Sequence, residues 1–169
     1  TYQYIPEPVK APLVGMLENL AEMSKHSRIR VLSIETLVPP AAVRAELNIG
    51  SDEKAVKVTR VRSNENERPY AFYVSWTLPQ VKGFTKKNIE KKTRLAILKE
   101  NGIKIAKVEQ TLAAENADPL VAAQLEINVN SALLSLKRHS FDFEGKMVDI
   151  LYGLYNPKLF TYKMVLDAE

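Results

Sequence analysis

The sequence predicts an α+β fold, in which a mostly antiparallel sheet has helices packed against it. Segments of alternating hydrophobicity outnumber helical segments, and several follow one another through short polar turns, which is typical of hairpins. The strict alternation of strand and helix that marks a parallel sheet is missing. With 169 residues, of which 46% are hydrophobic and 26% charged, the chain is long enough for a single domain with its own core.

The first half of the chain mixes helical and strand patterns. Pro12 lies near the first turn of a helix, where proline is tolerated, Pro39-Pro40 breaks a strand and opens a short helix, and Gly50 is expected to end it. The predicted elements are an extended lead-in at 1–10, a helix at 11–25, a strand at 29–37, a helix at 41–49, hairpin strands at 54–62 and 70–78, and a helix at 85–99 stopped at Asn101-Gly102.

Strands dominate the second half. Asp118 is a helix N-cap followed by Pro119 at the first helical position, and Glu144-Gly145-Lys146 is a tight turn between two strands. The predicted elements are a strand at 103–112, a helix at 119–126, and strands at 132–143, 147–155 and 159–166.

Two arginines continue an apolar face of the strand at 54–62. Side chains alternate along a strand, so Val56, Val58, Arg60 and Arg62 share one face. A guanidinium that is buried on such a face needs an anionic partner. One reading is a fork that binds a phosphate or carboxylate bidentately. The alternative is a pair satisfied by carboxylates of the protein or lying on an exposed part of the strand.

Asp149 and Tyr155 form a second candidate group. They lie six residues apart on a predicted strand and therefore face the same way, on a mostly apolar face where they could hydrogen-bond a polar ligand. Asp149 could equally be the counter-ion of Arg60 or Arg62.

Further candidates come from the strand at 70–78 and the helix at 85–99. Tyr73 could line a pocket or belong to the core. Thr93 could donate its hydroxyl to an anion, although most threonines within helices do not. Lys87, Lys91 and Arg94 form a basic stripe that could touch nucleic acid, but a solvated helix face explains it better, because no aromatic residues are interleaved for base stacking.

Composition excludes several classes of site. The chain has no cysteine and only two histidines, without metal-like spacing, and it carries no nucleophile elbow or phosphate-binding glycine loop. We therefore expect no catalytic residue, no metal and no cofactor. The net charge of +4 does not by itself indicate nucleic-acid binding. Because no transmembrane run or signal peptide is visible, we expect a cytoplasmic protein, and the initial Thr1 suggests a segment upstream.

The order of short motifs from about residue 25 to 167 resembles the UTRA effector-binding domain of GntR-type transcriptional regulators of the HutC subfamily. The motifs are Arg30-Val31-Leu32-Ser33, Pro39-Pro40, Thr59-Arg60-Val61-Arg62, Arg68-Pro69, Trp76-Thr77-Leu78-Pro79, Asn101-Gly102-Ile103, Glu109, Ala113-Ala114, Leu125-Glu126-Ile127, Leu134-Ser135-Leu136-Lys137-Arg138, Gly145, Asp149 and Tyr155-Asn156-Pro157-Lys158-Leu159-Phe160-Thr161-Tyr162.

The resemblance implies a chorismate-lyase-like fold, a homodimer, and a small-molecule pocket that controls an N-terminal winged helix-turn-helix domain. Residues 1–169 would then be one UTRA-like domain, with 1–10 leading in from that DNA-binding domain. The resemblance also implies that Arg60 and Arg62 bind an anion, that Asp149 and Tyr155 face the ligand, and that Thr93 lies near a position often held by serine. Tyr73 stands about where the family often has glutamate.

The C-terminal motif departs from the family, since a run of charged residues is replaced by Tyr155-Asn156-Pro157-Lys158-Leu159-Phe160. A smaller or more apolar anion than a sugar phosphate is therefore expected. The leading hypothesis is a regulator domain that senses a small anionic metabolite. Its alternatives are a chorismate-lyase-like enzyme, which would also hold carboxylates with arginines, and a dimerisation module whose Arg60 and Arg62 pair with protein carboxylates.

Overall fold

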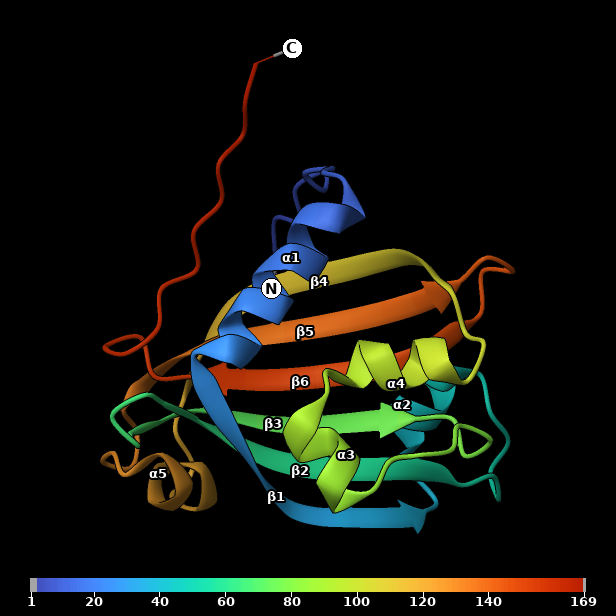
Figure 1. Cartoon of the computed structure of the whole chain (residues 1–169), viewed down its shortest axis with the longest axis horizontal. Helices are drawn as coiled ribbons and strands as arrows, with labels where there is room; N and C mark the ends of the chain where they lie inside the picture. Colours follow the sequence, from blue (N-terminus) through green and yellow to red (C-terminus); the bar gives the residue numbers. More distant parts are fainter. Residues whose placement is uncertain (1–2, 169) are drawn as a thin grey trace.

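A single six-stranded sheet runs through the structure, a computed structural model that describes residues 3–168 (Figure 1). Its strand order is β1-β2-β3-β6-β5-β4, and every neighbouring pair is antiparallel. The strands are β1 (Ser27–Leu37), β2 (Ala55–Asn64), β3 (Pro69–Thr77), β4 (Ile105–Asn116), β5 (Ala132–Asp142) and β6 (Met147–Tyr155). The predicted α+β class with a mostly antiparallel sheet is confirmed.

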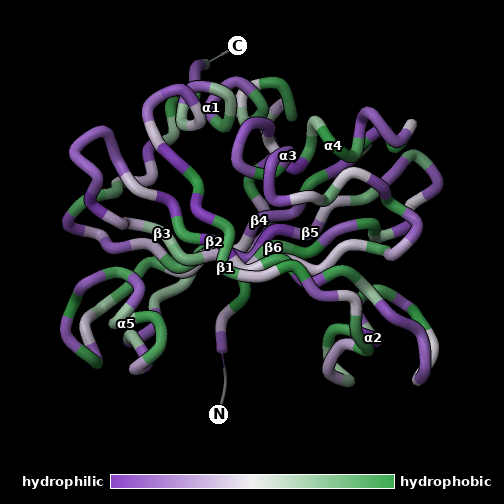
Figure 2. The backbone as a smooth tube through the Cα atoms, turned by 60° about the horizontal axis from the view of Figure 1, so that its bottom comes forward, coloured by the Kyte–Doolittle hydropathy of each residue, from purple (hydrophilic) through white to green (hydrophobic). Residues whose placement is uncertain are grey.

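Helices cover both faces of this sheet (Figure 2). Those on one face are α1 (Leu13–Lys25), α3 (Lys86–Lys91) and α4 (Arg94–Glu100), and those on the other are α2 (Ala41–Leu47) and α5 (Pro119–Leu125). On the first face Val58 packs with Ile89 and Leu98, and on the second Val61 packs with Val121. In the described part of the chain, no helix is both long and apolar enough to cross a membrane.

The strand register places a polar row beneath α3 and α4. Arg60 in β2 lies opposite Tyr73 in β3, and Tyr73 lies opposite Gly153 in β6. Two residues before Gly153 in β6, Leu151 lies opposite Arg138 in β5. Because residues opposite one another point to the same face, these side chains all stand on the α3–α4 side of the sheet.

The helix predicted at 85–99 is two helices, because the backbone leaves the helical conformation at Lys92 and Thr93. Thr93 is the N-cap of α4, and its Oγ1 accepts a hydrogen bond of 3.1 Å from the Ala96 backbone N–H. A threonine oxygen that satisfies a free N–H in this way starts a new helix, which changes the direction in which the following residues point.

Two other predictions are wrong, one about where a helix ends and one about a C-terminal strand. The helix after Pro39-Pro40 ends at Asn48, which adopts the left-handed conformation (φ 53°) that we expected of Gly50. The strand expected at 159–166 does not form. The backbone N–H groups of Leu159 and Phe160 both donate to the Asn156 carbonyl, which turns the chain, and the following residues to 168 are mostly exposed. The first two residues of the expected lead-in lie outside the described residues.

Hydrogen bonds of His26 stabilise the junction between α1 and β1. Its Nδ1 lies 2.5 Å from Glu65 Oε1 in the β2–β3 turn, and its Nε2 lies 3.0 Å from Glu22 Oε1 in α1. The hydrogen bond to Glu65, followed by that to Glu22, raises the pKa of His26 above its ordinary value. The imidazolium thus links three segments.

We predict that the imidazole of His26 titrates above its ordinary pKa in an NMR pH titration, and that Glu65→Gln lowers this pKa. A raised folded-state pKa means that the pair stabilises the fold below the unfolded pKa of about 6.5 and loses this contribution as the pH rises through the folded value. An unchanged His26 pKa in the variant would contradict the assignment.

Candidate functional site

A cavity of about 80 Å³ lies between the sheet and the α3–α4 segment. Strands β2, β3, β5 and β6 form its floor, residues 89–95 cover it, and Ser24 and Ser27 from α1 and β1 close one end. All of the predicted ligand-binding residues line it: Arg60, Arg62, Tyr73, Thr93, Asp149 and Tyr155. The structure thus brings these residues together, while their role in binding stays a prediction.

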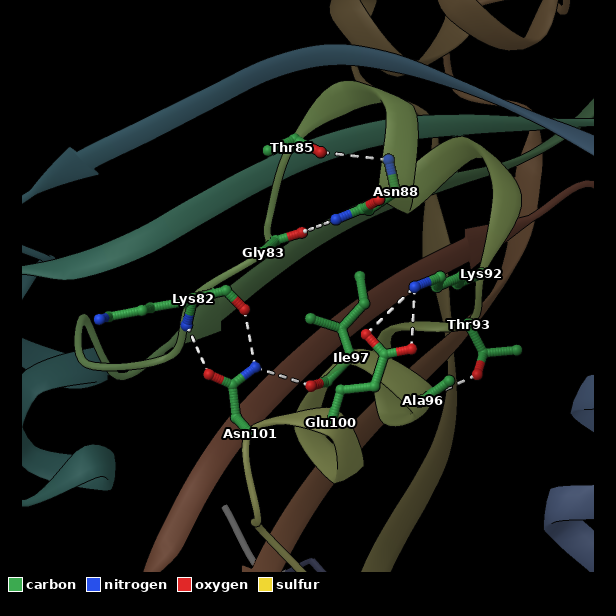
Figure 3. A network of polar contacts seen from close by, with 10 residues as sticks. All are labelled: Lys82, Gly83, Thr85, Asn88, Lys92, Thr93, Ala96, Ile97, Glu100 and Asn101. Atoms are coloured by element: carbon green, nitrogen blue, oxygen red, sulfur yellow. Dashed lines mark hydrogen bonds and ion pairs between the residues drawn. The ribbon is translucent and has the colours of Figure 1, made fainter.

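The cover of the cavity is held by its own hydrogen bonds (Figure 3). Asn101 connects the end of α4 to the loop before α3, because its Nδ2 donates to the Lys82 carbonyl (2.7 Å) and its Oδ1 accepts from the Lys82 N–H (2.8 Å). Lys92 and Glu100 form an ion pair of 2.8 Å across α4. These bonds fix the place of the short helices, each of which is too short to be stable alone.

Arg60 is the most isolated charge in the cavity. Its side chain is almost fully buried, with 5% of the residue exposed, and it makes no hydrogen bond to the described residues. The guanidinium lies 4.5 Å from the centroid of the Tyr73 ring. Burial, followed by repulsion from Arg94, lowers the pKa of Arg60 to about 9, so that it is still a cation at neutral pH.

Arg62 has only neutral partners. Its Nε donates to Tyr73 Oη at 3.2 Å and its Nη1 to Ser27 Oγ at 2.6 Å. Ser27 Oγ in turn donates to the Met23 carbonyl at 2.6 Å, in the last turn of α1. A continuous hydrogen-bonded chain therefore leads from the cavity to α1.

Asp149 pairs with Arg94, so the interpretation that it is the counter-ion of Arg60 or Arg62 is wrong. Its Oδ1 accepts a hydrogen bond from Arg94 Nη2 and another, of 2.5 Å, from Thr77 Oγ1. The side chains of Asp149 and Arg94 are 1% and 5% exposed. Arg94 was expected on a solvated stripe, but the break at Thr93 starts a new helix that turns it inward.

Arg138 is a buried cation that the sequence analysis missed. Only 8% of it is exposed, and its Nε donates to Gln110 Oε1 on β4 at 2.9 Å. Burial lowers the pKa of Arg138 as well. The signal was present in the sequence, because Leu134, Leu136 and Arg138 alternate along β5 in the same way as Val56, Val58 and Arg60 along β2.

Two tyrosines pack between the arginines. Tyr73 and Tyr155 meet edge to face, with ring centroids 5.6 Å apart. Burial and the proximity of Tyr73 raise the pKa of Tyr155 well above its ordinary value, so it is a neutral hydroxyl at physiological pH. Gly153 lies beneath both rings, and a Cβ there would be 3.0 Å from Tyr155 and 3.2 Å from Tyr73. The absent side chain makes room for the phenols.

Positive charge dominates the buried part of the site. Four arginines are buried there, Arg60, Arg62, Arg94 and Arg138, against the one buried carboxylate of Asp149. Arg60 Nε, Arg94 Nε and the hydroxyls of Ser75 and Ser140 are buried without a hydrogen-bond partner among the described residues. Unpaired buried donors are costly, and an acceptor-rich anion is the chemical group that would satisfy the two arginines, which line the cavity, as Ser75 and Ser140 do not.

The sequence profile of the UTRA domain matches residues 22–161. This is the fold of the effector-binding domains of GntR-family transcriptional regulators, and the chain belongs to the UTRA domain family. The HutC subfamily is not distinguished by this match.

Solved structures share the fold at low sequence identity. A protein from Streptomyces coelicolor assigned as a transcriptional regulator has a TM-score of 0.78 and 20% identity, over 83% of this chain and 95% of that one. A GntR-family regulator from Enterococcus faecalis has a TM-score of 0.74 and 21% identity, over 82% and 99%. The effector domain of PhnF from Mycobacterium smegmatis has a TM-score of 0.75 and 16% identity, over 84% of this chain and 88% of that one. No curated protein matches the sequence.

We predict that Arg60→Met raises the stability of the protein without ligand. The substitution removes a buried cation that has no counter-ion, and loses in exchange only its contact with Tyr73. The free energy of unfolding should rise by on the order of 1 kcal/mol, or about 2–4 °C in melting temperature. Arg28→Met, at an exposed arginine, is the control. A clear loss of stability would show that Arg60 serves the fold.

Asp149→Asn should have the opposite effect. It leaves Arg94 buried without a counter-ion, and breaking one partner of a buried pair costs about 3–5 kcal/mol. Urea unfolding measures the change. The double variant Arg94→Met/Asp149→Leu removes both charges and should be less destabilised than Asp149→Asn. Equal losses in the two variants would mean that packing, not the unpaired charge, is responsible.

Proposed function

We propose that this chain is the sensor domain of a bacterial transcriptional regulator and that its cavity binds a small anionic metabolite through Arg60 and Arg62. One observation carries the proposal: Arg60 is 5% exposed and has no hydrogen-bond partner among the described residues. A dimerisation module without a ligand would be expected to pair these arginines with protein carboxylates. The buried carboxylate, Asp149, is bonded to Arg94 instead.

The remaining residues have distinct roles in this proposal. Tyr73 holds Arg62 through its hydroxyl and supports Arg60 with its ring, and Tyr155 offers a neutral hydroxyl to the polar body of the ligand. Thr93 caps α4 with its oxygen and keeps its hydroxyl proton for a ligand. Asp149 acts as a positioning residue, because it orients Arg94 toward the cavity.

Ligand binding would act on DNA binding through α1. An anion at Arg62 competes with Ser27 for the guanidinium, and Ser27 is bonded to the last turn of α1. Differential affinity for two α1 positions would shift their populations. We propose a winged helix-turn-helix domain before α1, with residues 1–10 as the lead-in to it, and a homodimer of the HutC subfamily in the cytoplasm. In support, this chain spans only 64% of the PhnF chain from Mycobacterium smegmatis.

The comparisons favour this reading over a chorismate-lyase-like enzyme, since the matched proteins are described as transcriptional regulators. We therefore assign no reaction to the cavity and no cofactor to the protein.

The proposal is tested by thermal shift and calorimetry with a panel of small phosphates and carboxylates. At least one anion should raise the melting temperature, with an increase that grows with its concentration, because a ligand that binds only the folded state stabilises it. Arg60→Ala/Arg62→Ala should weaken that binding at least tenfold, while Arg28→Ala leaves it unchanged. Full ligand stabilisation in the double variant would contradict the assigned site.

A further inference from the structure

We infer that the cavity recognises a short anion with two separate acidic groups, and that Arg138 binds the second one. This inference rests on the proposed anion-binding function and adds to it the chemical class of the ligand. It depends on three features of the structure: the free terminal nitrogens of Arg138, its distance from Arg60 and Arg62, and the excess of buried positive charge.

Arg138 is placed to bind a ligand but not to stabilise the fold. It lines the cavity from β5, and its Nε is held by the neutral Gln110. Its two terminal nitrogens make no hydrogen bond and no ion pair with the described residues. Of the two acidic groups that line the cavity, Asp149 is bonded to Arg94, and Glu90 lies in the exposed cover, where it contacts the Val31 N–H. A buried guanidinium fixed only through Nε presents its remaining donors to a carboxylate or phosphate.

The two cationic ends of the cavity lie far apart on the sheet. Arg60 is on β2 and Arg138 on β5, three strand spacings away, which amounts to roughly 14 Å between their backbones. Strand side chains stand roughly perpendicular to the sheet, so the two arginines rise from well-separated points, although the guanidinium of Arg60 leans over Tyr73 of the next strand.

Arg62, which also donates to Tyr73 of β3, and Arg138 each have a hydrogen-bond partner on an edge strand. Arg62 is bonded to Ser27 of β1 and Arg138 to Gln110 of β4, and these are the two opposite edge strands. Between them the rings of Tyr73 and Tyr155 stand over Gly153, so a ligand that joins the two ends lies against these phenols. A single acidic group at the Arg60–Arg62 end therefore does not reach Arg138, and two groups joined by a short linker do.

Charge balance points to a doubly charged ligand, and the separation of the arginines points to two groups. The buried residues of the site carry three more positive than negative charges. A monocarboxylate would leave two of them uncompensated, and a doubly charged anion leaves one, which lowers the cost of holding cations away from water. The volume of about 80 Å³ limits the linker to a few carbon atoms.

A homologous series of dicarboxylates, from malonate to adipate, varies the distance between the two acidic groups of the ligand and so tests which separation the cavity binds. Each is compared by calorimetry, at constant ionic strength, with the monocarboxylate of the same carbon number and with inorganic phosphate, which carries its charge on one group. One chain length should bind at least tenfold more tightly than its monocarboxylate. Arg138→Gln should abolish this advantage and leave monocarboxylate binding unchanged, whereas Arg28→Gln should alter neither.

The possible failures are distinguishable. Two results would refute the inference that Arg138 binds a second acidic group. One is that phosphate or a monocarboxylate binds as tightly as every dicarboxylate, and the other is that Arg138→Gln still binds the dicarboxylate more tightly than its monocarboxylate. In both cases the proposed anion site at Arg60 and Arg62 remains. If no anion binds, or if binding survives Arg60→Ala/Arg62→Ala, the proposed function falls and this inference with it. Arg138→Met, which fills the same volume without charge, replaces Arg138→Gln should the latter fail to fold.

Discussion

Four buried arginines and a single buried carboxylate line the cavity on one face of the sheet, and the rest of the site follows from this imbalance. A buried charge is tolerated when it is paired, as Arg94 is with Asp149, and it is a cost to the fold when it is not, as for Arg60. The unpaired donors fit the binding of an anion, which is the use that we propose for this cost. Stability and ligand binding are thus expected to oppose one another at Arg60.

The scaffold makes this arrangement possible by separating the tasks of its two faces. On one face α2 and α5 cover an apolar layer, and on the other the short helices α3 and α4 cover both apolar residues and the arginines. The cover depends on hydrogen bonds such as those of Asn101, and of the four buried arginines it contributes Arg94, while the other three come from the sheet. The hydrogen-bonded chain Arg62–Ser27–Met23 joins the same cavity to α1.

Much of the fold was predictable because its signals are local. Alternation identified the strands β1 to β6, and the Asp118-Pro119 cap located α5. The errors arose where a non-local contact or a cap competed with a pattern. The apolar residues from Leu159 onward alternate like a strand, but the turn at Asn156 and the stacking of Phe160 on Tyr155, 4.3 Å between centroids, take the chain off the sheet. One capping threonine, Thr93, moved Arg94 from the surface to the interior.

By itself, the sequence determined which residues share a strand face, and therefore that Arg60 and Arg62 stand together in an apolar row. It equally determined that Arg138 stands in one, since alternation is a property of a single strand. Only the tertiary structure decided which arginine forms an ion pair with a carboxylate, because that depends on the strand order and on the direction of α4 after its N-cap, Thr93. In the folded protein Asp149 pairs with Arg94, and Arg60 has no counter-ion. Such pairing across a sheet cannot be predicted from the spacing of residues within one segment.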